Sequence, residues 1–361
     1  MKTFHCDVCS GPLFFENSLC TRCNAAVGYL PDRDEMAVLK EGRHRPCRNF
    51  VEEQVCNWAI PAEDPSEYCL SCRLTRVIPD LGQPGARALW QSAEMAKRRL
   101  IHGLLDLGLP VVGKDVDEEQ GLAFEFRADD PGSDQPVLTG HAEGIITLNI
   151  AEADDAERER RRLQMREPYR TLLGHLRHES GHYYWNLLVR DSERLSGFRR
   201  VFGDERADYA EALKRHYDQG APADWQERFV SSYASSHPWE DWAETWAHYL
   251  HMADSLDTAA ASGIALRRVD RRDAPPGRVT QIHGSDDFSG MIGSWVALTC
   301  VLNNLNRSMG MQDAYPFALP EPALAKLRFV HELVSGEEPR IRNRPPVATL
   351  AAAGKPLRAN A

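Results

Sequence analysis

The sequence predicts an α+β protein in which a small cysteine-rich domain precedes a larger, mostly helical domain. Eight of the nine cysteines lie in the N-terminal fifth of the chain. Beyond them, apolar residues recur at helical spacing in residues 85–109, 172–188 and 291–309. Residues 122–126 and 141–150 have the composition of strands. Helices therefore dominate the larger domain, and a few strands accompany them.

Composition divides the chain into three parts. Residues 1–80 form the cysteine-rich domain, residues 81–335 form the main domain, and residues 336–361 are expected to be a disordered tail rich in Pro, Arg and Ala. The 361 residues are 42% hydrophobic, which is enough for one core of ordinary size plus a smaller module.

The cysteines of the first domain are spaced as metal ligands. Each C-x-x-C pair can form a tight turn that presents two thiolates to one ion, and four thiolates complete a tetrahedron. The simplest partition places one zinc ion on Cys6, Cys9, Cys20 and Cys23, and a second on Cys47, Cys56, Cys69 and Cys72. A cross-braced partition and rubredoxin-like iron sites stay open as alternatives. A module this small needs metal to supply folding energy.

The charge of this domain argues against nucleic acid as its partner. Residues 1–80 carry nine Lys/Arg and twelve Asp/Glu, a net charge of 9 − 12 = −3, whereas a nucleic-acid-binding ribbon has a basic face. A structural role, or binding to a protein partner, is favoured instead. The remaining cysteine, Cys300, lies in an apolar run and is expected to be an inert buried thiol.

The motif His178-Glu179-Ser180-Gly181-His182 has the pattern H-E-x-x-H inside an apolar helical pattern. Positions four apart share one helix face, so both imidazoles can bind one zinc ion. Glu179 then lies beside them, where a carboxylate can take a proton from a zinc-activated water. His175 falls near the same face and is interpreted as a core histidine or a partner of the site, not as a ligand.

A second predicted helix begins at Pro238 and supplies carboxylates. A hydrolytic zinc site has three protein ligands and an open position for water, and Glu240 is the predicted third ligand. Glu244, one turn later, is predicted to accept the far N–H of a ligand histidine. The alternatives for the third ligand are His248 and Asp241.

Together these segments resemble a known group of enzymes. H-E-S-G-H followed by Y-A-x-x-x-P-x-E-D-W-A-E-T-W-A-H-Y-L is similar to the gluzincin metallopeptidases, in the variant found in anthrax-toxin lethal factor. Most of residues 1–335 resembles a bacterial family of zinc-binding metallopeptidases with an N-terminal zinc ribbon. The resemblance implies a zincin-like fold with zinc ligands His178, His182 and Glu240.

The same resemblance implies that Glu179 is the general base and that Tyr233 stabilises the oxyanion. By analogy with zincins, the strand expected within residues 141–150 would border the cleft and pair with extended substrate.

The predicted function is zinc-dependent hydrolysis of a peptide or protein substrate, with one catalytic and two structural zinc ions. A non-catalytic zinc-ribbon scaffold and a zinc hydrolase of another amide bond are the alternatives. The net charge of −10 argues against nucleic acid or an anionic membrane as a partner. The sequence has no run of 18 apolar residues and no apolar signal segment at its start, so we expect a cytoplasmic protein.

Overall fold

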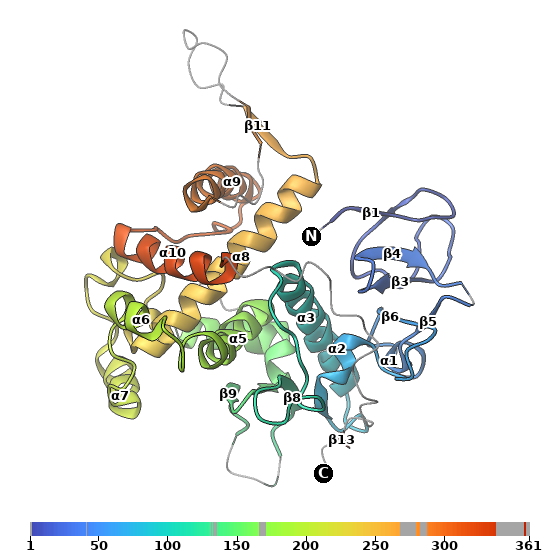
Figure 1. Ribbon diagram of the computed structural model, residues 1–361, viewed down its shortest axis with the longest axis horizontal. Coiled ribbons are helices and arrows are strands. Elements are labelled where there is room, and N and C mark those ends of the chain that lie inside the picture. Colours follow the sequence, from blue (N-terminus) through green and yellow to red (C-terminus); the bar gives the residue numbers. More distant parts are fainter. Residues whose placement is uncertain are drawn as a thin grey trace. The chain divides into compact units, whose positions relative to one another are not determined.

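Helices and strands are mixed along the chain, which confirms the predicted α+β class (Figure 1). The computed structural model describes residues 2–40, 42–130, 132, 136–165, 171–267, 279–281, 287–336 and 357–358. Within the predicted tail, Gly336 and strand β13 (Leu357–Arg358) are described, and the other residues lie outside the described part of the chain.

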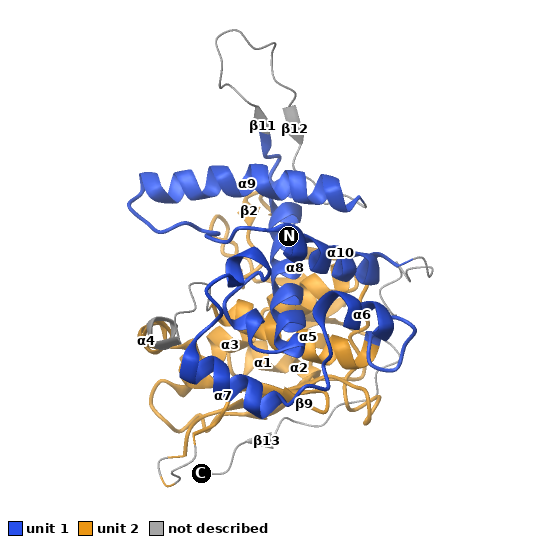
Figure 2. Ribbon diagram, turned by 90° about the vertical axis from the view of Figure 1, so that its left-hand side faces the viewer, with its two compact units in different colours: residues 1–3, 167–169, 188–336 blue, residues 4–166, 170–187, 337–361 orange. Residues whose placement is uncertain are grey.

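The chain forms two compact units (Figure 2). Unit 1 comprises residues 1–3, 167–169 and 188–336, and unit 2 comprises residues 4–166, 170–187 and 337–361. The cysteine-rich region therefore shares unit 2 with the sheet and with the helix that carries the H-E-x-x-H motif. The helix that carries Glu240 belongs to unit 1.

The cysteine-rich region of unit 2 consists of short antiparallel hairpins. They pair β1 (Phe4–His5) with β2 (Pro12–Leu13), β3 (Val27–Leu30) with β4 (Glu35–Val38), and β5 (His44–Pro46) with β6 (Ala59–Pro61). Two single-turn helices, α1 (Arg48–Val51) and α2 (Leu70–Arg73), directly follow Cys47 and Cys69. The rings of Phe15, Tyr29 and Trp58 pack against one another, and His102 of the next long helix lies on Phe15 with ring centroids 5.1 Å apart. Aromatic packing thus joins this region to the rest of unit 2.

A five-stranded sheet forms the centre of unit 2, in the order β13-β7-β8-β10-β9. Strands β7 (Thr75–Ile78), β8 (Ala123–Arg127) and β10 (Ile145–Asn149) are parallel, and β9 (Gly140–Ala142) is antiparallel to β10. The expectation that β10 pairs with substrate is wrong, because β8 and β9 already occupy its two edges. The outermost strand on this side is β9, which a two-residue turn at Glu143 and Gly144 connects to β10.

Three helices accompany the sheet. The long helix α3 (Ala86–Asp106) buries Trp90, Ile101 and Leu104, and the charged helix α4 (Asp155–Met165) follows the 3₁₀ turn Ile150–Ala153. The motif helix α5 (Leu172–Leu188) is buried from residue 176 to residue 185. The hydroxyl groups of Tyr183 and Tyr184 donate hydrogen bonds to the backbone oxygens of Gln120 and Pro110, so α5 is tied to the segment before β8.

The described part of unit 1 is mainly helical. Its elements are α6 (Leu195–Phe202), α7 (Tyr209–Gln219), 3₁₀ turns at Trp225–Glu227 and Tyr233–Ser235, α8 (Pro238–Ala261), β11 (Ala265–Arg267), β12 (Val279–Gln281), α9 (Phe288–Ser308) and α10 (Glu321–Ser335). His237 caps α8, because its Nδ1 accepts a hydrogen bond from Trp239 N, and Pro238 occupies the first turn. Trp242 of α8 packs against Phe198 and Phe202 of α6.

Helix α9 is the one described helix whose length and composition would let it cross a membrane. It contacts α8, where Trp295 packs against His251 with ring centroids 5.3 Å apart, and Met291, Trp295 and Leu298 are buried. Its opposite face is exposed and includes Cys300. The prediction of a buried thiol at this position was wrong, because Leu298 and Cys300 lie two positions apart and point to different sides of the helix.

Candidate metal centres and catalytic residues

Four cysteines near the N-terminus form one cluster within unit 2. The Sγ atoms of Cys6 and Cys23 lie 3.7 Å apart, and those of Cys9 and Cys20 lie 3.6 Å apart. Both C-x-x-C turns have the same local structure: Ser10 N donates to Cys6 O, Asn24 N donates to Cys20 O, and Ser10 and Asn24 have positive φ angles. Each turn therefore presents two thiols to the same side.

The second cluster contains Cys47, Cys56, Cys69 and Cys72, all buried. The Sγ atoms of Cys56 and Cys69 lie 3.7 Å apart, and backbone N–H groups of Trp58, Cys69 and Cys72 donate to three of the four sulfurs. Such donors stabilise thiolates. The structure thus groups the eight cysteines according to the simplest partition of the sequence and not as a cross-braced pair.

Both clusters fit zinc. Four thiolates at about 2.3 Å from a tetrahedral zinc ion lie about 3.8 Å from one another, close to the sulfur–sulfur distances given above. A disulfide would need about 2 Å. In the second cluster, Arg98 of α3 lies close enough to the sulfurs to interact with them. Burial lowers the pKa of Arg98, but the charges of Cys56 and of Glu94 outweigh it and raise the pKa. A buried cation here offsets the negative charge of a four-thiolate site.

Helix α5 brings the motif histidines together within unit 2. The rings of His178 and His182 are buried, with centroids 5.0 Å apart and planes at 82°. Glu179 is buried beside them. Burial raises its pKa, but the hydrogen bond from His175 and the charges on the neighbouring histidines outweigh burial and lower the pKa below its usual value. Glu179 is therefore a carboxylate at neutral pH.

His175 lies between two carboxylates. Its Nδ1 lies 2.7 Å from Oε2 of Glu152, and its Nε2 lies 3.3 Å from Oε1 of Glu179. Burial lowers the pKa of His175, but both carboxylates outweigh burial and raise the pKa to about 9. A second histidine near the motif, His141 of β9, stacks on His182 with ring centroids 6.4 Å apart. Burial lowers the pKa of His141 to about 4, so its ring is neutral.

In unit 1, Glu240 is buried in the first turn of α8, and Oε1 of its carboxylate accepts a hydrogen bond of 2.7 Å from the hydroxyl of Tyr209. Tyr233 lies in the 3₁₀ turn before α8. Burial, together with the charge of Glu240, raises the pKa of Tyr233 far above its usual value, so its hydroxyl stays protonated. Tyr233 can therefore act as a hydrogen-bond donor.

The other residues predicted on α8 have identified partners within unit 1. Oε2 of Glu244 accepts a hydrogen bond of 2.5 Å from Ser231. Asp241 forms a buried ion pair of 2.7 Å with Lys326. Nδ1 of His248 lies 2.7 Å from the hydroxyl of Tyr315. Two of the candidates for third ligand, Asp241 and His248, are thus engaged by α10 and by the segment before it.

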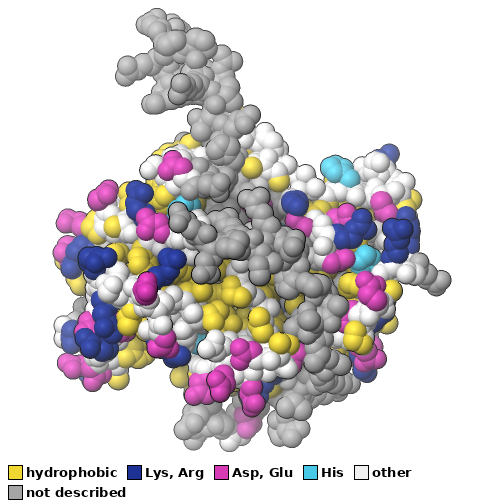
Figure 3. Space-filling model, viewed as in Figure 1, with side chains coloured by type: hydrophobic (Ala, Val, Ile, Leu, Met, Phe, Trp, Pro, Cys, Tyr) yellow, Lys and Arg dark blue, Asp and Glu magenta, His cyan; other side chains and the backbone are white. Residues whose placement is uncertain are grey.

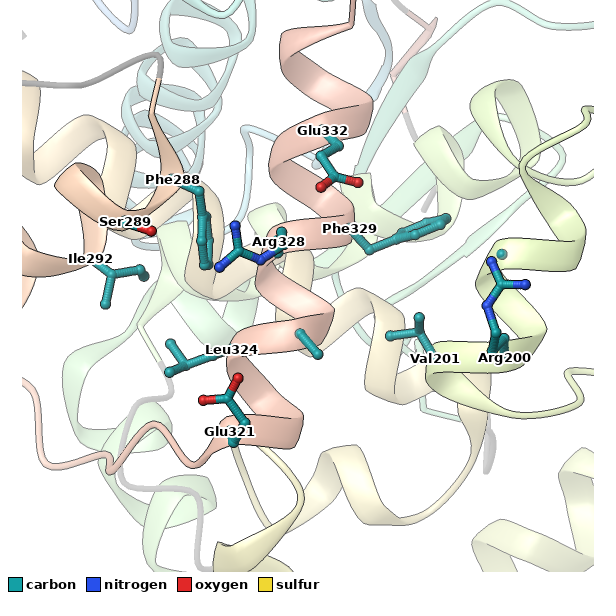
Figure 4. Close-up of a pocket in the computed structure, with 12 residues that line it drawn as sticks. Arg200, Val201, Phe288, Ser289, Ile292, Glu321, Leu324, Arg328, Phe329 and Glu332 are labelled. Atoms are coloured by element: carbon teal, nitrogen blue, oxygen red, sulfur yellow. The ribbon is translucent and has the colours of Figure 1, made fainter.

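A pocket of about 510 Å³ lies elsewhere in unit 1, lined by residues of α6, α9 and α10 (Figure 4). The guanidinium of Arg328 lies 4.5 Å from the ring centroid of Phe288, and Glu321, Glu332 and Arg200 also line the pocket. None of the predicted site residues lines it. Its charges balance, and it offers no set of metal ligands.

Sequence reasoning missed Tyr209, Glu152 and Thr139 as parts of the candidate site. Thr139 donates a hydrogen bond of 2.7 Å to Glu152. Tyr209 lies 31 residues before Glu240, and Glu152 lies 23 residues before His175. Neither pair has a spacing that a helix or strand period would reveal. The sequence offered one signal for Glu152: it is a carboxylate that comes just after the strand before the motif helix.

These features define a zinc-binding protein with two four-thiol sites and a histidine pair on a buried helix. Residues 86–333 match the family described as "Putative zinc-binding metallo-peptidase", and residues 3–83 match a zinc-ribbon domain. The chain belongs to this family, as the resemblance implied.

Relatives occur in mycobacteria. Proteins of Mycobacterium tuberculosis (strains H37Rv and CDC 1551) and Mycobacterium bovis, each named only as uncharacterized, are 46% identical to this chain over 341 residues. The matches cover 94% of this chain and 97% of each relative. No solved structure matches the chain.

Proposed function

We propose that the protein is a gluzincin-type zinc peptidase in which His178, His182 and Glu240 bind one catalytic zinc ion. Two imidazoles and a carboxylate are a standard ligand set for hydrolytic zinc, with one position open for water. The buried, mutually perpendicular rings on α5 and the buried carboxylate on α8 support the proposal. The two four-cysteine clusters would hold two further, structural zinc ions.

Three side chains of this protein would carry out the reaction. Bound zinc would polarise the scissile carbonyl and acidify the attacking water. Glu179 takes a proton from that water as the carbon–oxygen bond forms, and gives a proton to the leaving amine as the carbon–nitrogen bond breaks. Tyr233 donates a hydrogen bond to the oxyanion, and Glu244 orients a ligand histidine.

The strongest support for the proposal is the ionised, buried carboxylate of Glu179. It is buried next to two histidines, and its pKa is nevertheless below the usual value. A purely structural zinc site has no use for an ionised carboxylate beside its ligands, whereas a hydrolase requires one.

The test is cleavage of an unfolded-protein substrate or a peptide library by the purified full chain. Glu179→Gln is expected to abolish cleavage, and Glu227→Gln, which changes an exposed glutamate of the same chemistry, is expected to preserve it. Cleavage that persists in Glu179→Gln would exclude Glu179 as the base. A zinc-loaded wild type that cleaves no peptide would favour the two alternatives, a scaffold or a hydrolase of another amide, and assays with non-peptide amides would separate them.

We further propose that the substrate is a peptide or protein, that the zinc ribbon has a structural role or binds a protein, and that neither nucleic acid nor a membrane is a partner. On the face that Figure 3 shows, Lys and Arg side chains lie among Asp and Glu side chains, and the net charge is −10. The four-thiol clusters support a cytoplasmic location, because thiols stay reduced there.

A further inference from the structure

A chain of hydrogen bonds within unit 2 leads from the sheet to Glu179. Thr139 Oγ1 donates to Oε1 of Glu152 over 2.7 Å, and Oε2 of Glu152 lies 2.7 Å from Nδ1 of His175. Nε2 of the same ring lies 3.3 Å from Oε1 of Glu179. Both carboxylates are buried, and the side chain of His175 is 15% exposed. The four side chains come from the segment before β9, the 3₁₀ turn after β10, and α5.

The two carboxylates that face the His175 ring determine which of its nitrogens carry a proton. Each ring nitrogen of His175 lies near a carboxylate oxygen, and only an imidazolium has an N–H group for both. A neutral ring would turn a lone pair towards one of the carboxylates. Because a buried carboxylate without a cationic partner is strongly destabilising, His175 also makes the burial of ionised Glu179 tolerable.

The chain also limits the motion of Glu179. A glutamate side chain has three rotatable bonds, and ordering it costs conformational entropy. His175 lies four residues before Glu179, on the same face of α5, so the bond to Oε1 restrains the carboxylate from one helical turn away. The restraint extends to the sheet, since Thr139 Oγ1 also accepts a hydrogen bond of 3.0 Å from Asn149 N of β10.

We propose that His175 is a positioning residue that holds Glu179 in its reactive orientation, and that Glu152 fixes the ring of His175 for this purpose. The proposal rests on the function proposed above, in which Glu179 is the general base. A base must lie within hydrogen-bond reach of the proton that it takes, and a displacement of about 1 Å can lower the rate about 100-fold.

The first test compares variants of the zinc-loaded full chain in steady-state peptide cleavage. His175→Leu is expected to lower kcat about 10- to 100-fold with KM and zinc content unchanged. His175→Gln, whose amide can donate to Glu179, should recover part of kcat. The matched control is His44→Gln, which removes another histidine–carboxylate contact of unit 2, 3.2 Å to Asp32. Unchanged kcat in His175→Leu would overturn the proposal. A lower kcat that is fully explained by loss of zinc or by a lower melting temperature would overturn it as well.

The second test does not depend on cleavage. Proton NMR of the wild type should show low-field imidazole N–H signals from His175; Glu152→Gln should shift one and Glu179→Gln the other. Signals that do not respond to Glu179→Gln would overturn the proposal. A wild type that cleaves no peptide but shows both shifts would count against the proposed function and leave the hydrogen-bonded chain established.

Discussion

Tyr209, at the start of α7, donates a hydrogen bond of 2.7 Å to Oε1 of Glu240, in the first turn of α8. The carboxylate is almost completely buried, at 1% exposure. The bond fixes the orientation of a side chain that we propose as a zinc ligand. Partners of this kind hold metal ligands in place and contribute to metal affinity.

Tyr209→Phe is therefore expected to weaken zinc binding at the third site about 10- to 100-fold. Competition with a chelator of known affinity, monitored on the fully loaded protein, measures the change. Tyr249→Phe is the matched control, because it removes the hydroxyl of another tyrosine of unit 1, which lies 3.1 Å from His331, a residue that is not a proposed ligand. Equal zinc affinity in the wild type and Tyr209→Phe would show that Tyr209 does not support the ligand.

Zinc content tests the ligand sets directly. Elemental analysis should find about three zinc ions and no iron in the wild type, and one ion fewer in His178→Ala, because each site is expected to hold one ion. The loss should be confined to the third site, since His178 belongs to neither cysteine cluster. Two ions in both proteins would mean that the motif helix holds no metal as purified.

The second cysteine cluster should stabilise unit 2. Cys56→Ser is expected to remove one zinc ion and to lower the free energy of unfolding by at least about 3 kcal/mol, because the binding energy of a structural zinc ion is folding energy, on the order of 10 kcal/mol. Urea unfolding with parallel zinc analysis measures both. The exposed Cys300 provides the control, and Cys300→Ser should stay within about 0.5 kcal/mol of the wild type.

Periodic patterns predicted the parts of the site that depend on local spacing. The C-x-x-C turns and the H-E-x-x-H helix need only a few consecutive residues, so the sequence specifies which of their side chains share one face. Glu240 was predicted from the carboxylates of the second helix and from the need for a third ligand. Tyr233 required the family resemblance, since its distance from the motif follows no structural period. The assignment of α+β class succeeded for a similar reason: α3, α5 and α8 are long and strongly patterned.

Tertiary contacts could not be predicted in this way. Tyr209 and Glu152 are ordinary residues of their segments until the chain folds, and only then meet Glu240 and His175. The substrate-pairing role assigned to β10 failed because residues 140–142 form a separate strand that covers its edge. Cys300 was misassigned because an apolar run does not reveal which face of a helix packs against a neighbour.

His248 should make unit 1 sensitive to acid. Burial lowers its pKa to about 4, from an ordinary value of 6.5. Between these values the unfolded chain binds a proton that the folded chain does not, so the free energy of unfolding falls as pH falls from 6.5 to 4, by up to about 3 kcal/mol. Urea midpoints of the wild type and His248→Asn over this range measure the effect. The free energy of unfolding should depend less steeply on pH in the variant than in the wild type. Equal pH dependence in the two proteins would exclude His248 as a cause of the acid sensitivity.

Tyr233→Phe tests the proposed oxyanion donor. Removing one such donor typically lowers kcat about 100- to 1,000-fold, because the hydrogen bond forms mainly in the transition state. KM and zinc content should stay constant, since the hydroxyl is not a proposed ligand and contributes little to binding of the ground state. The ring remains to pack against His216, whose centroid lies 5.8 Å away, so the fold around the 3₁₀ turn should persist. Steady-state kinetics together with zinc analysis distinguishes the possible roles of Tyr233. A rise in KM at constant kcat would make Tyr233 a substrate-binding residue. Unchanged kinetics would mean that its ring serves only in packing.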